Sequence, residues 1–275
     1  MNILVSTICF VNRQKPGAEI YATFAQRLIE DVMKKTPFDI MITTNEPEHF
    51  TNQKEIYGER VIIRTELLEN HRLTVGVFNQ LLKFYSIKDI DLKYDWVMYL
   101  DCDAGIGDTW NLDEVNNMLE TNLSNGIDML GTRTNCILHI ELQDHENRVR
   151  EHKKLIEGGE VNPYFAGNLF SNKFFFYEVS SENGPKEWFD AILPSEHVFM
   201  VKNDERLPIM CKTFEDFCYK FETQGEYPIT VDMEAFEIGV SALLSGYKMG
   251  DFGNYGLYHI IKVACNLNNW EKVKY

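Results

Sequence analysis

Residues 95–103 of the chain read Asp-Trp-Val-Met-Tyr-Leu-Asp-Cys-Asp. The apolar residues 96–100 form an unbroken run between acidic residues, and Gly105 and Gly107 follow shortly afterwards. A run this short, without helical spacing, predicts a β-strand that is buried on both faces. Such strands are typical of the interior of a parallel sheet, so this stretch indicates where the centre of the fold lies.

Two aspartates, Asp101 and Asp103, end the predicted strand. In open α/β sheets, ligands bind in the crevice outside the carboxyl ends of the strands, so we expect both side chains at this rim. Paired carboxylates at such a rim can hold a hard divalent cation, which can in turn hold phosphate oxygens. As a bare motif, such a pair is usually two solvated acids in a turn, but the apolar strand before it and the glycines after it favour a functional site.

The segments around this strand alternate between β-type and α-type patterns. Apolar, β-branched runs predict strands, and apolar residues spaced by three and four predict helices. The predicted strands are 3–11, 39–44, 60–64, 96–100 and 127–131, and the predicted helices include 18–35, a segment around 78–85, one around 214–221 and one ending at Leu244. This alternation predicts an α/β fold with a mostly parallel central sheet and helices on both faces.

Local signals indicate where several helices begin and end. Asn111 can cap a helix, with Glu114 three residues later as its partner. Gly246 is expected to end the helix that precedes it. Residues 250–275 read as loop with short structure. Because no repeat or linker interrupts the chain, we expect one domain over residues 1–275.

Composition restricts the class of protein. The 275 residues carry a net charge of −15, which argues against the uniformly basic surface of a protein that coats nucleic acid or anionic lipid. The six cysteines form no CxxC pair, so a structural zinc site is not expected. The sequence has no apolar run of membrane-spanning length and no leader pattern at Met1. These features predict a reduced, cytoplasmic protein without membrane attachment.

Two further stretches suggest contact with a partner. Residues 148–154 are a basic island in an acidic chain, either a solvated helix face or a patch for a phosphate-bearing partner. Residues 162–170 are rich in aromatic residues around Gly167, and a glycine there permits close approach of another backbone or of a ligand.

The order of these features resembles the nucleotide-sugar glycosyltransferases of the GT-A fold. The resemblance rests on an amino-terminal strand, two further strand-helix units, and an apolar strand that ends in Asp101-Cys102-Asp103. It implies a Rossmann-like GT-A domain, with nucleotide-sugar binding in residues 1–133 and acceptor binding in residues 134–275. It also implies that Asp101 and Asp103 bind Mn²⁺ or Mg²⁺, which bridges the diphosphate of the sugar donor.

The resemblance implies roles for further residues. It suggests His259 as a third metal ligand, and Asp232 and Glu234 as catalytic carboxylates near the sugar, although each of these acids also suits a helix start. Candidates on the acceptor side are Tyr164, Gly167, Asn168, Arg148 and Arg150. The candidates for binding the donor are Thr7, Phe10, Arg13, Lys83, Asp101 and Lys262, with Lys15 as a further cation near the same rim.

The acceptor remains open at the level of sequence. The composition suggests a viral or low-GC bacterial source, and the chain is similar in this respect to bacteriophage enzymes that glycosylate hydroxymethylated cytosine in DNA. In that case Arg133 and the basic island would contact DNA phosphates, and Tyr164 would stack on a flipped base. A saccharide, lipid-linked or protein acceptor is the alternative, and we expect a monomer or a small homo-oligomer.

Other classes of protein share parts of the pattern. Phosphohydrolases of the haloacid dehalogenase type also place Asp-x-Asp after a strand. In them the motif usually lies on the first strand, and a Thr or Val usually follows where this chain has Gly105. A sugar- or nucleotide-binding module without turnover and an acidic interaction protein without a site are further alternatives.

Overall fold

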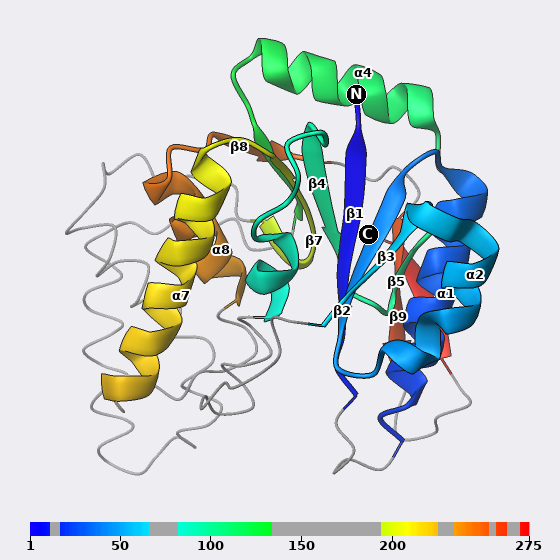
Figure 1. Cartoon of the computed structure of the whole chain (residues 1–275). Helices are drawn as coiled ribbons and strands as arrows, with labels where there is room; N and C mark the ends of the chain where they lie inside the picture. Colours follow the sequence, from blue (N-terminus) through cyan, green and yellow to red (C-terminus); the bar gives the residue numbers. More distant parts are fainter. Residues whose placement is uncertain are drawn as a thin grey trace.

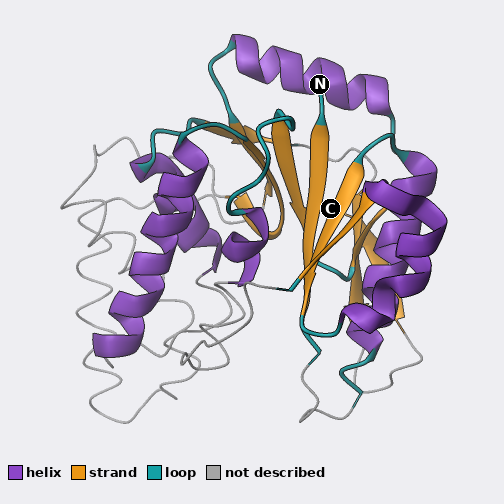
Figure 2. Ribbon diagram, viewed as in Figure 1, coloured by secondary structure: helices purple, strands orange, loops and turns teal. Residues whose placement is uncertain are grey.

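The computed structural model describes residues 1–11, 17–65, 82–133, 194–224, 234–252, 257–262 and 270–274. A seven-stranded mixed sheet forms its centre, in the order β3-β2-β1-β4-β7-β6-β8. Helices lie on both sides of this sheet (Figures 1 and 2). The predicted α/β class and the mostly parallel sheet are therefore confirmed.

The first part of the chain builds four adjacent parallel strands. Each pair in the order β3-β2-β1-β4 is parallel. The elements are β1 (Ile3–Cys9), α1 (Ile20–Lys35), β2 (Asp39–Thr44), η1 (Pro47–Phe50), α2 (Thr51–Tyr57), η2 (Gly58–Arg60), β3 (Val61–Arg64) and β4 (Trp96–Leu100). A helical segment over residues 82–87 precedes β4.

The rest of the chain completes the sheet and adds a smaller one. The elements are β5 (Ala104–Ile106), α4 (Leu112–Ser124), β6 (Met129–Arg133), β7 (Pro194–Lys202), α7 (Arg206–Gln224), α8 (Glu234–Leu244), β8 (Met249–Asp251), β9 (Leu257–Lys262) and β10 (Trp270–Lys274). The strand β7 is antiparallel to both β4 and β6, and β8 is parallel to β6. Since β7 lies between β4 and β6, the two predicted halves of the chain share one sheet.

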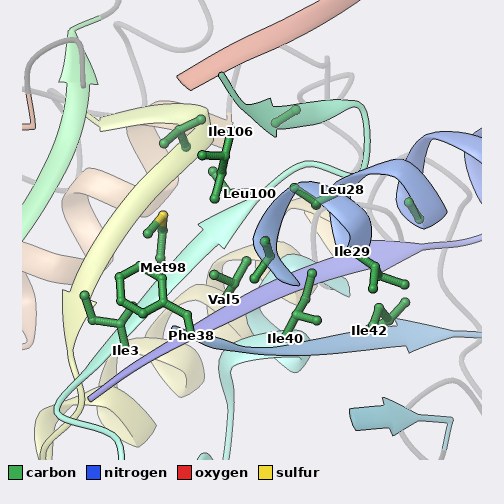
Figure 3. Close-up of a cluster of buried hydrophobic side chains, with 14 of the residues drawn as sticks. Ile3, Val5, Leu28, Ile29, Phe38, Ile40, Ile42, Met98, Leu100 and Ile106 are labelled. Atoms are coloured by element: carbon green, nitrogen blue, oxygen red, sulfur yellow. The ribbon is translucent and has the colours of Figure 1, made fainter. Parts of the chain in front are cut away.

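The centre of the fold is β4, as its sequence predicts. All five of its side chains are buried. Because alternate residues of a strand point to opposite faces, β4 contributes to two separate cores. Trp96, Met98 and Leu100 join the core under α1, while Val97 and Tyr99 join the core under α7 and α8. Figure 3 shows part of the first core, including Ile3, Val5, Leu28, Ile29, Phe38, Ile40, Ile42, Met98, Leu100 and Ile106.

The second core holds the helical segment 82–87 against α7. The rings of Phe84 and Phe214 stack with centroids 3.7 Å apart, and the Tyr85 hydroxyl donates a 3.0 Å hydrogen bond to Glu215. The Ser6 hydroxyl of β1 donates to the carbonyl of Ser86 at 2.7 Å. The helical segment 82–87 therefore covers the face opposite to α1 and α2.

Two features of the second half were not predicted from the sequence. Residues 194–202, for which no element was predicted, form the inner strand β7. The short structure expected in the tail includes β9 and β10, which pair along five residues each and form a three-stranded sheet with β5. Both strands carry β-branched and aromatic residues, which pack well against a neighbouring strand.

Candidate functional site

The candidate site lies where the strand order of the sheet reverses. From β1 the chain proceeds to β2 and β3 on one side, and then returns to β4 on the other side of β1. In parallel α/β sheets, the carboxyl ends at such a reversal leave a crevice in which ligands bind. The segment after β4 begins at Asp101, so Asp101-Cys102-Asp103 starts at this edge of the sheet, as predicted.

A tight turn places the two aspartates at this edge. The amide of Ala104 donates a 2.8 Å hydrogen bond to the carbonyl of Asp101, which reverses the chain into β5. Asp101, Cys102 and Asp103 are each partly exposed, whereas the residues on either side of them are buried. Of the residues 96–106, the motif is therefore the part that solvent or a ligand reaches.

The carboxylate of Asp101 is held by two groups on the α7 side of the sheet. The Tyr99 hydroxyl donates a 2.7 Å hydrogen bond to Oδ1 of Asp101, and Nζ of Lys83 lies 3.4 Å from the same oxygen. The Lys83 ammonium also lies 5.6 Å from the centroid of the Tyr99 ring, within cation–π range. The side chain of Lys83 is only 8% exposed, so this positive charge is largely shielded from water.

The other side of the motif faces α1. Burial raises the pKa of the Tyr21 hydroxyl, and the charges of Asp103 and Asp101 raise it further. Tyr21 belongs to the first turn of α1, so the negative charge of the motif acts on the start of this helix. The pKa of the Cys102 thiol is raised by its hydrogen bond with Cys9, then by burial, and further by both aspartates.

Asp101 and Asp103 are the two carboxylates of the motif that could hold a divalent cation at this edge. Among the described residues, no group of three or more His, Cys, Asp and Glu side chains is arranged to hold a metal ion. Mg²⁺ is commonly bound by one or two protein carboxylates together with substrate phosphates and water. Asp101 and Asp103 can supply the two carboxylates, and Mg²⁺ or Mn²⁺ would take its other ligands from phosphate and water.

The carboxyl-terminal strand β9 reaches the same place. It pairs with β5 so that His259 is opposite Ala104, the residue that follows Asp103. Lys262 lies three residues further along β9, at its end. The backbone thus brings His259, a residue distant in sequence, next to the motif, while Lys262 lies further along the same strand, where it pairs with Trp270 of β10. Their roles as metal ligand and donor contact stay predictions.

The remaining predicted residues are distributed as follows. Thr7 lies inside β1 with a fully buried side chain, and its hydroxyl makes no hydrogen bond within the described part of the chain. Phe10 follows the end of β1 and packs against the core under α7. Glu234 is the first residue of α8. Outside the described residues lie Arg13, Lys15, Arg148, Arg150, Tyr164, Gly167, Asn168 and Asp232.

Three residues at this edge were not identified from the sequence. Tyr99 was assigned to the core, yet its hydroxyl contacts Asp101. Tyr21 in the first turn of α1 is 37% exposed, and the charges of both aspartates raise the pKa of its hydroxyl. Cys9 was not connected with the motif, yet a hydrogen bond with its thiol raises the pKa of Cys102. The strand period would place Tyr99 on the same face as Asp101, but the other two contacts depend on the tertiary fold.

Comparison with known proteins assigns no family to this arrangement. No protein-family model matches the sequence, and no curated protein is significantly similar to it. In the described part of the chain, no helix is both long enough and apolar enough to span a membrane.

Proposed function

We propose that this protein is a metal-dependent glycosyltransferase of the GT-A type, which moves a sugar from a nucleotide-diphosphate donor to an acceptor hydroxyl. The observation that carries the proposal is the position of Asp101 and Asp103. Both follow the buried strand β4 at the reversal of strand order beside β1, where open α/β sheets bind ligands.

The charges at this edge suit a nucleotide diphosphate. Asp101 and Asp103 would hold Mn²⁺ or Mg²⁺, which acts as a Lewis acid when bound and neutralises charge on the departing diphosphate. Lys83 adds a second positive charge 3.4 Å from Asp101. Because Lys83 is shielded from water, its attraction for a phosphate oxygen at this edge is stronger than that of a solvated lysine.

The carboxyl-terminal strands would complete the donor site. His259 would serve as the third metal ligand and Lys262 as a further phosphate contact, supported by the register that places β9 beside Ala104. Phe10 and Arg13 belong to the segment that follows β1, and they would line the nucleotide side of the crevice, whereas the side chain of Thr7 is fully buried inside β1.

A carboxylate near the anomeric carbon would assist the transfer itself. Cleavage of a glycosidic bond passes through an oxocarbenium-like state. A nearby carboxylate can stabilise the positive charge of this state, or it can act as a base that deprotonates the acceptor hydroxyl. Asp232 or Glu234 would fill this role, since Glu234 begins α8, a helix that packs on the same face of the sheet as Lys83.

As acceptor we propose 5-hydroxymethylcytosine in DNA, with a saccharide or protein acceptor as the alternative. Arg148 and Arg150 would bind phosphates, while Tyr164, Gly167 and Asn168 would form the pocket for a flipped base. The basic island 148–154 supports this acceptor because it concentrates positive charge in a chain with a net charge of −15.

The test of donor binding is a thermal-shift panel of nucleotide sugars, each with and without Mn²⁺. A donor that binds the native state raises the melting temperature by mass action. We expect a shift that requires Mn²⁺ and disappears in Asp101→Asn and Asp103→Asn. The control is Asp113→Asn, an exposed acid in the first turn of α4, which should keep the shift.

Two results would contradict the proposal. If no nucleotide sugar produces a shift that depends on Mn²⁺, the chain does not bind its donor in the proposed way. If Asp101→Asn and Asp103→Asn unfold the protein, as measured by circular dichroism, and the molecules that remain folded still bind the donor, the two acids are structural.

The acceptor is tested separately with a mobility-shift assay on duplex DNA containing hydroxymethylcytosine. Phosphate contacts make binding weaken steeply with added salt. We expect Arg148→Ala combined with Arg150→Ala to weaken binding and to reduce the salt dependence. Binding that is indifferent to this double substitution and to salt would exclude the DNA acceptor and favour the saccharide or protein alternative.

A further inference from the structure

The side chain of Asn45 joins the ends of β1 and β2 at the carboxyl edge of the sheet. The ladder between these two strands ends with the pair Cys9 and Thr44. Beyond it, Oδ1 of Asn45 accepts a 2.9 Å hydrogen bond from the amide of Val11, and Nδ2 of Asn45 donates a 3.0 Å hydrogen bond to the carbonyl of Val11. One side-chain amide thus continues the pairing of β1 with β2 past the last residues of both strands.

The two hydrogen bonds fix the backbone where the chain leaves β1. The side chain of Val11 is 2% exposed and belongs to the core under α1, while Phe10 packs against the core under α7. Asn45 itself is exposed, so its side chain fills neither core. Its contribution at this position is therefore the hold on the backbone of Val11.

The exit of β1 borders the crevice at which Asp101 and Asp103 lie. The strand β1 lies between β2 and β4, and the strand order reverses beside it (Figure 1). Ligands of open α/β sheets bind outside the carboxyl ends of the strands at such a reversal. A backbone that is already held in place loses little freedom when a ligand arrives, so a preformed border favours binding.

We propose that Asn45 is a positioning residue of the donor site, which fixes Phe10 and Val11 so that the nucleotide side of the crevice is formed before the donor binds. This inference rests on the proposed function, which supplies the class of ligand, a nucleotide sugar. Asn45 acts through the backbone of Val11 and not by contact with the donor. Asn45→Ala should weaken binding of the donor about tenfold, because the ligand must then order this segment.

Asn203 provides a matched control at the opposite edge of the sheet. Its Nδ2 donates two hydrogen bonds of 3.0 Å, to the carbonyls of Asp91 and Tyr94, just before β4 begins. Asn203 thus also holds backbone through two side-chain hydrogen bonds, but at the amino end of β4 instead of the carboxyl end. Asn203→Ala should destabilise the protein as Asn45→Ala does and leave donor binding unchanged.

Hydrogen exchange of the folded protein without ligand tests the hold on Val11. The amide of Val11 loses its acceptor in Asn45→Ala, so we expect it to exchange about tenfold faster than in the wild-type protein. Amides inside β1 should keep their rates, and Asn203→Ala should leave the rate at Val11 unchanged. An amide of Val11 that is unprotected in the wild-type protein, or equally protected in Asn45→Ala, would overturn the proposal.

Calorimetric titration with the nucleotide sugar that gives the largest thermal shift tests the effect on the donor. We expect the Kd to rise about tenfold in Asn45→Ala and to stay unchanged in Asn203→Ala. An unchanged Kd in Asn45→Ala, or an equal rise in both variants, would exclude a positioning role. A wild-type protein that binds no nucleotide sugar would contradict the proposed function, and the exchange rate of the Val11 amide would then decide alone whether Asn45 fixes the exit of β1.

Discussion

The hydroxyl of Tyr99 donates a 2.7 Å hydrogen bond to Oδ1 of Asp101. The two residues are separated by one position in and just beyond β4, so the period of a strand places them on the same face. The ring of Tyr99 is fixed between neighbours and stacks on Phe199 with centroids 5.1 Å apart. A rigid, buried side chain therefore orients the first acid of the motif before any ligand binds.

Replacing Tyr99 with phenylalanine should remove this orientation while the packing of the ring is kept. Hydrogen bonds to charged groups contribute about 1.5–3 kcal/mol, and Asp101 retains some contact with water, so we expect the free energy of unfolding to fall by about 1–2 kcal/mol. Urea denaturation measures this change. Mn²⁺ affinity should also fall, as measured by calorimetric titration, because Asp101 is no longer held in one position.

A matched bond at another position separates the two effects. The Tyr94 hydroxyl donates a 2.7 Å hydrogen bond to Oδ2 of Asp39, at the start of β2 and away from the motif. Tyr94→Phe should lose a similar amount of stability and leave the affinity for Mn²⁺ unchanged. Equal effects of the two substitutions on Mn²⁺ binding would show that Tyr99 acts only through the stability of the fold.

Lys83 should act in opposite directions on the stability of the protein and on its affinity for a cation. Its ammonium lies close to Asp101 in a largely buried position. Lys83→Met leaves this carboxylate without that positive charge, which should destabilise the metal-free protein by about 1–3 kcal/mol. Because a competing positive charge is removed, Mn²⁺ should bind more tightly and raise the melting temperature more than in the wild-type protein.

Lys93 provides the corresponding control on the surface. Its ammonium lies 4.8 Å from the centroid of the Tyr94 ring, and this contact does not include Asp101 or Asp103. Lys93→Met should lower the stability of the metal-free protein much less than Lys83→Met does. It should leave the rise in melting temperature that Mn²⁺ causes unchanged. A smaller Mn²⁺ shift in Lys83→Met than in the wild-type protein would mean that Lys83 helps, rather than competes with, the bound cation.

The sequence predicted the elements whose signals are local. The apolar run of β4 is buried on both faces, and β2 spans the predicted residues 39–44. The strand β7 was missed although residues 198–201 are all apolar. A short apolar run does not by itself distinguish a strand from a buried helical turn, and its position between β4 and β6 depends on long-range pairing.

The candidate site was predictable only in part, for the same reason. Asp101 and Asp103 could be placed at the sheet edge because they directly follow a buried strand. The contact between Cys9 and Cys102 and the pairing of His259 with Ala104 join residues that are far apart in sequence. No periodicity contains that information, since it arises when the strands β1, β4, β5 and β9 assemble.

The cap of α4 is a local prediction that the structure confirms and that a single substitution can test. Oδ1 of Asn111 accepts hydrogen bonds from the amides of Asp113 and Glu114, and Nδ2 of Asn111 lies 3.3 Å from the Glu114 carboxylate. Asn111→Ala should lower the free energy of unfolding by about 1 kcal/mol, measured by urea denaturation. Asn111→Asp should retain most of the stability, and a loss equal to that of alanine would argue against capping.

Arg206 connects three parts of the fold at the amino end of α7. It binds both carboxylate oxygens of Asp204, at 3.0 and 2.6 Å, and Oδ2 of Asp128 at 2.6 Å. It also donates to the carbonyl of Gly246, and its guanidinium lies 4.3 Å from the centroid of the Tyr247 ring. Arg206→Met should therefore lower the free energy of unfolding by about 2 kcal/mol at neutral pH.

This loss should depend on pH in a defined direction. Burial raises the pKa of Asp204, but the hydrogen bonds and charge of Arg206 outweigh that effect and hold it below its ordinary value of 3.8. A lowered pKa in the folded state contributes stability that is present above pH 3.8 and is lost as the pH falls through the folded value. The difference between the wild-type protein and Arg206→Met, measured by urea denaturation, should shrink as the pH is lowered below about 4.

An exposed ion pair on the same helix gives the comparison. Lys212 lies 2.7 Å from Asp216, and both side chains are 61% exposed. Exposed pairs contribute little because water and salt screen them, so Lys212→Met should change the free energy of unfolding far less at every pH. An Arg206→Met difference that stays constant from neutral pH to acid would show that Arg206 stabilises the protein through packing on Tyr247 and the bond to Gly246, and not through the charge of Asp204.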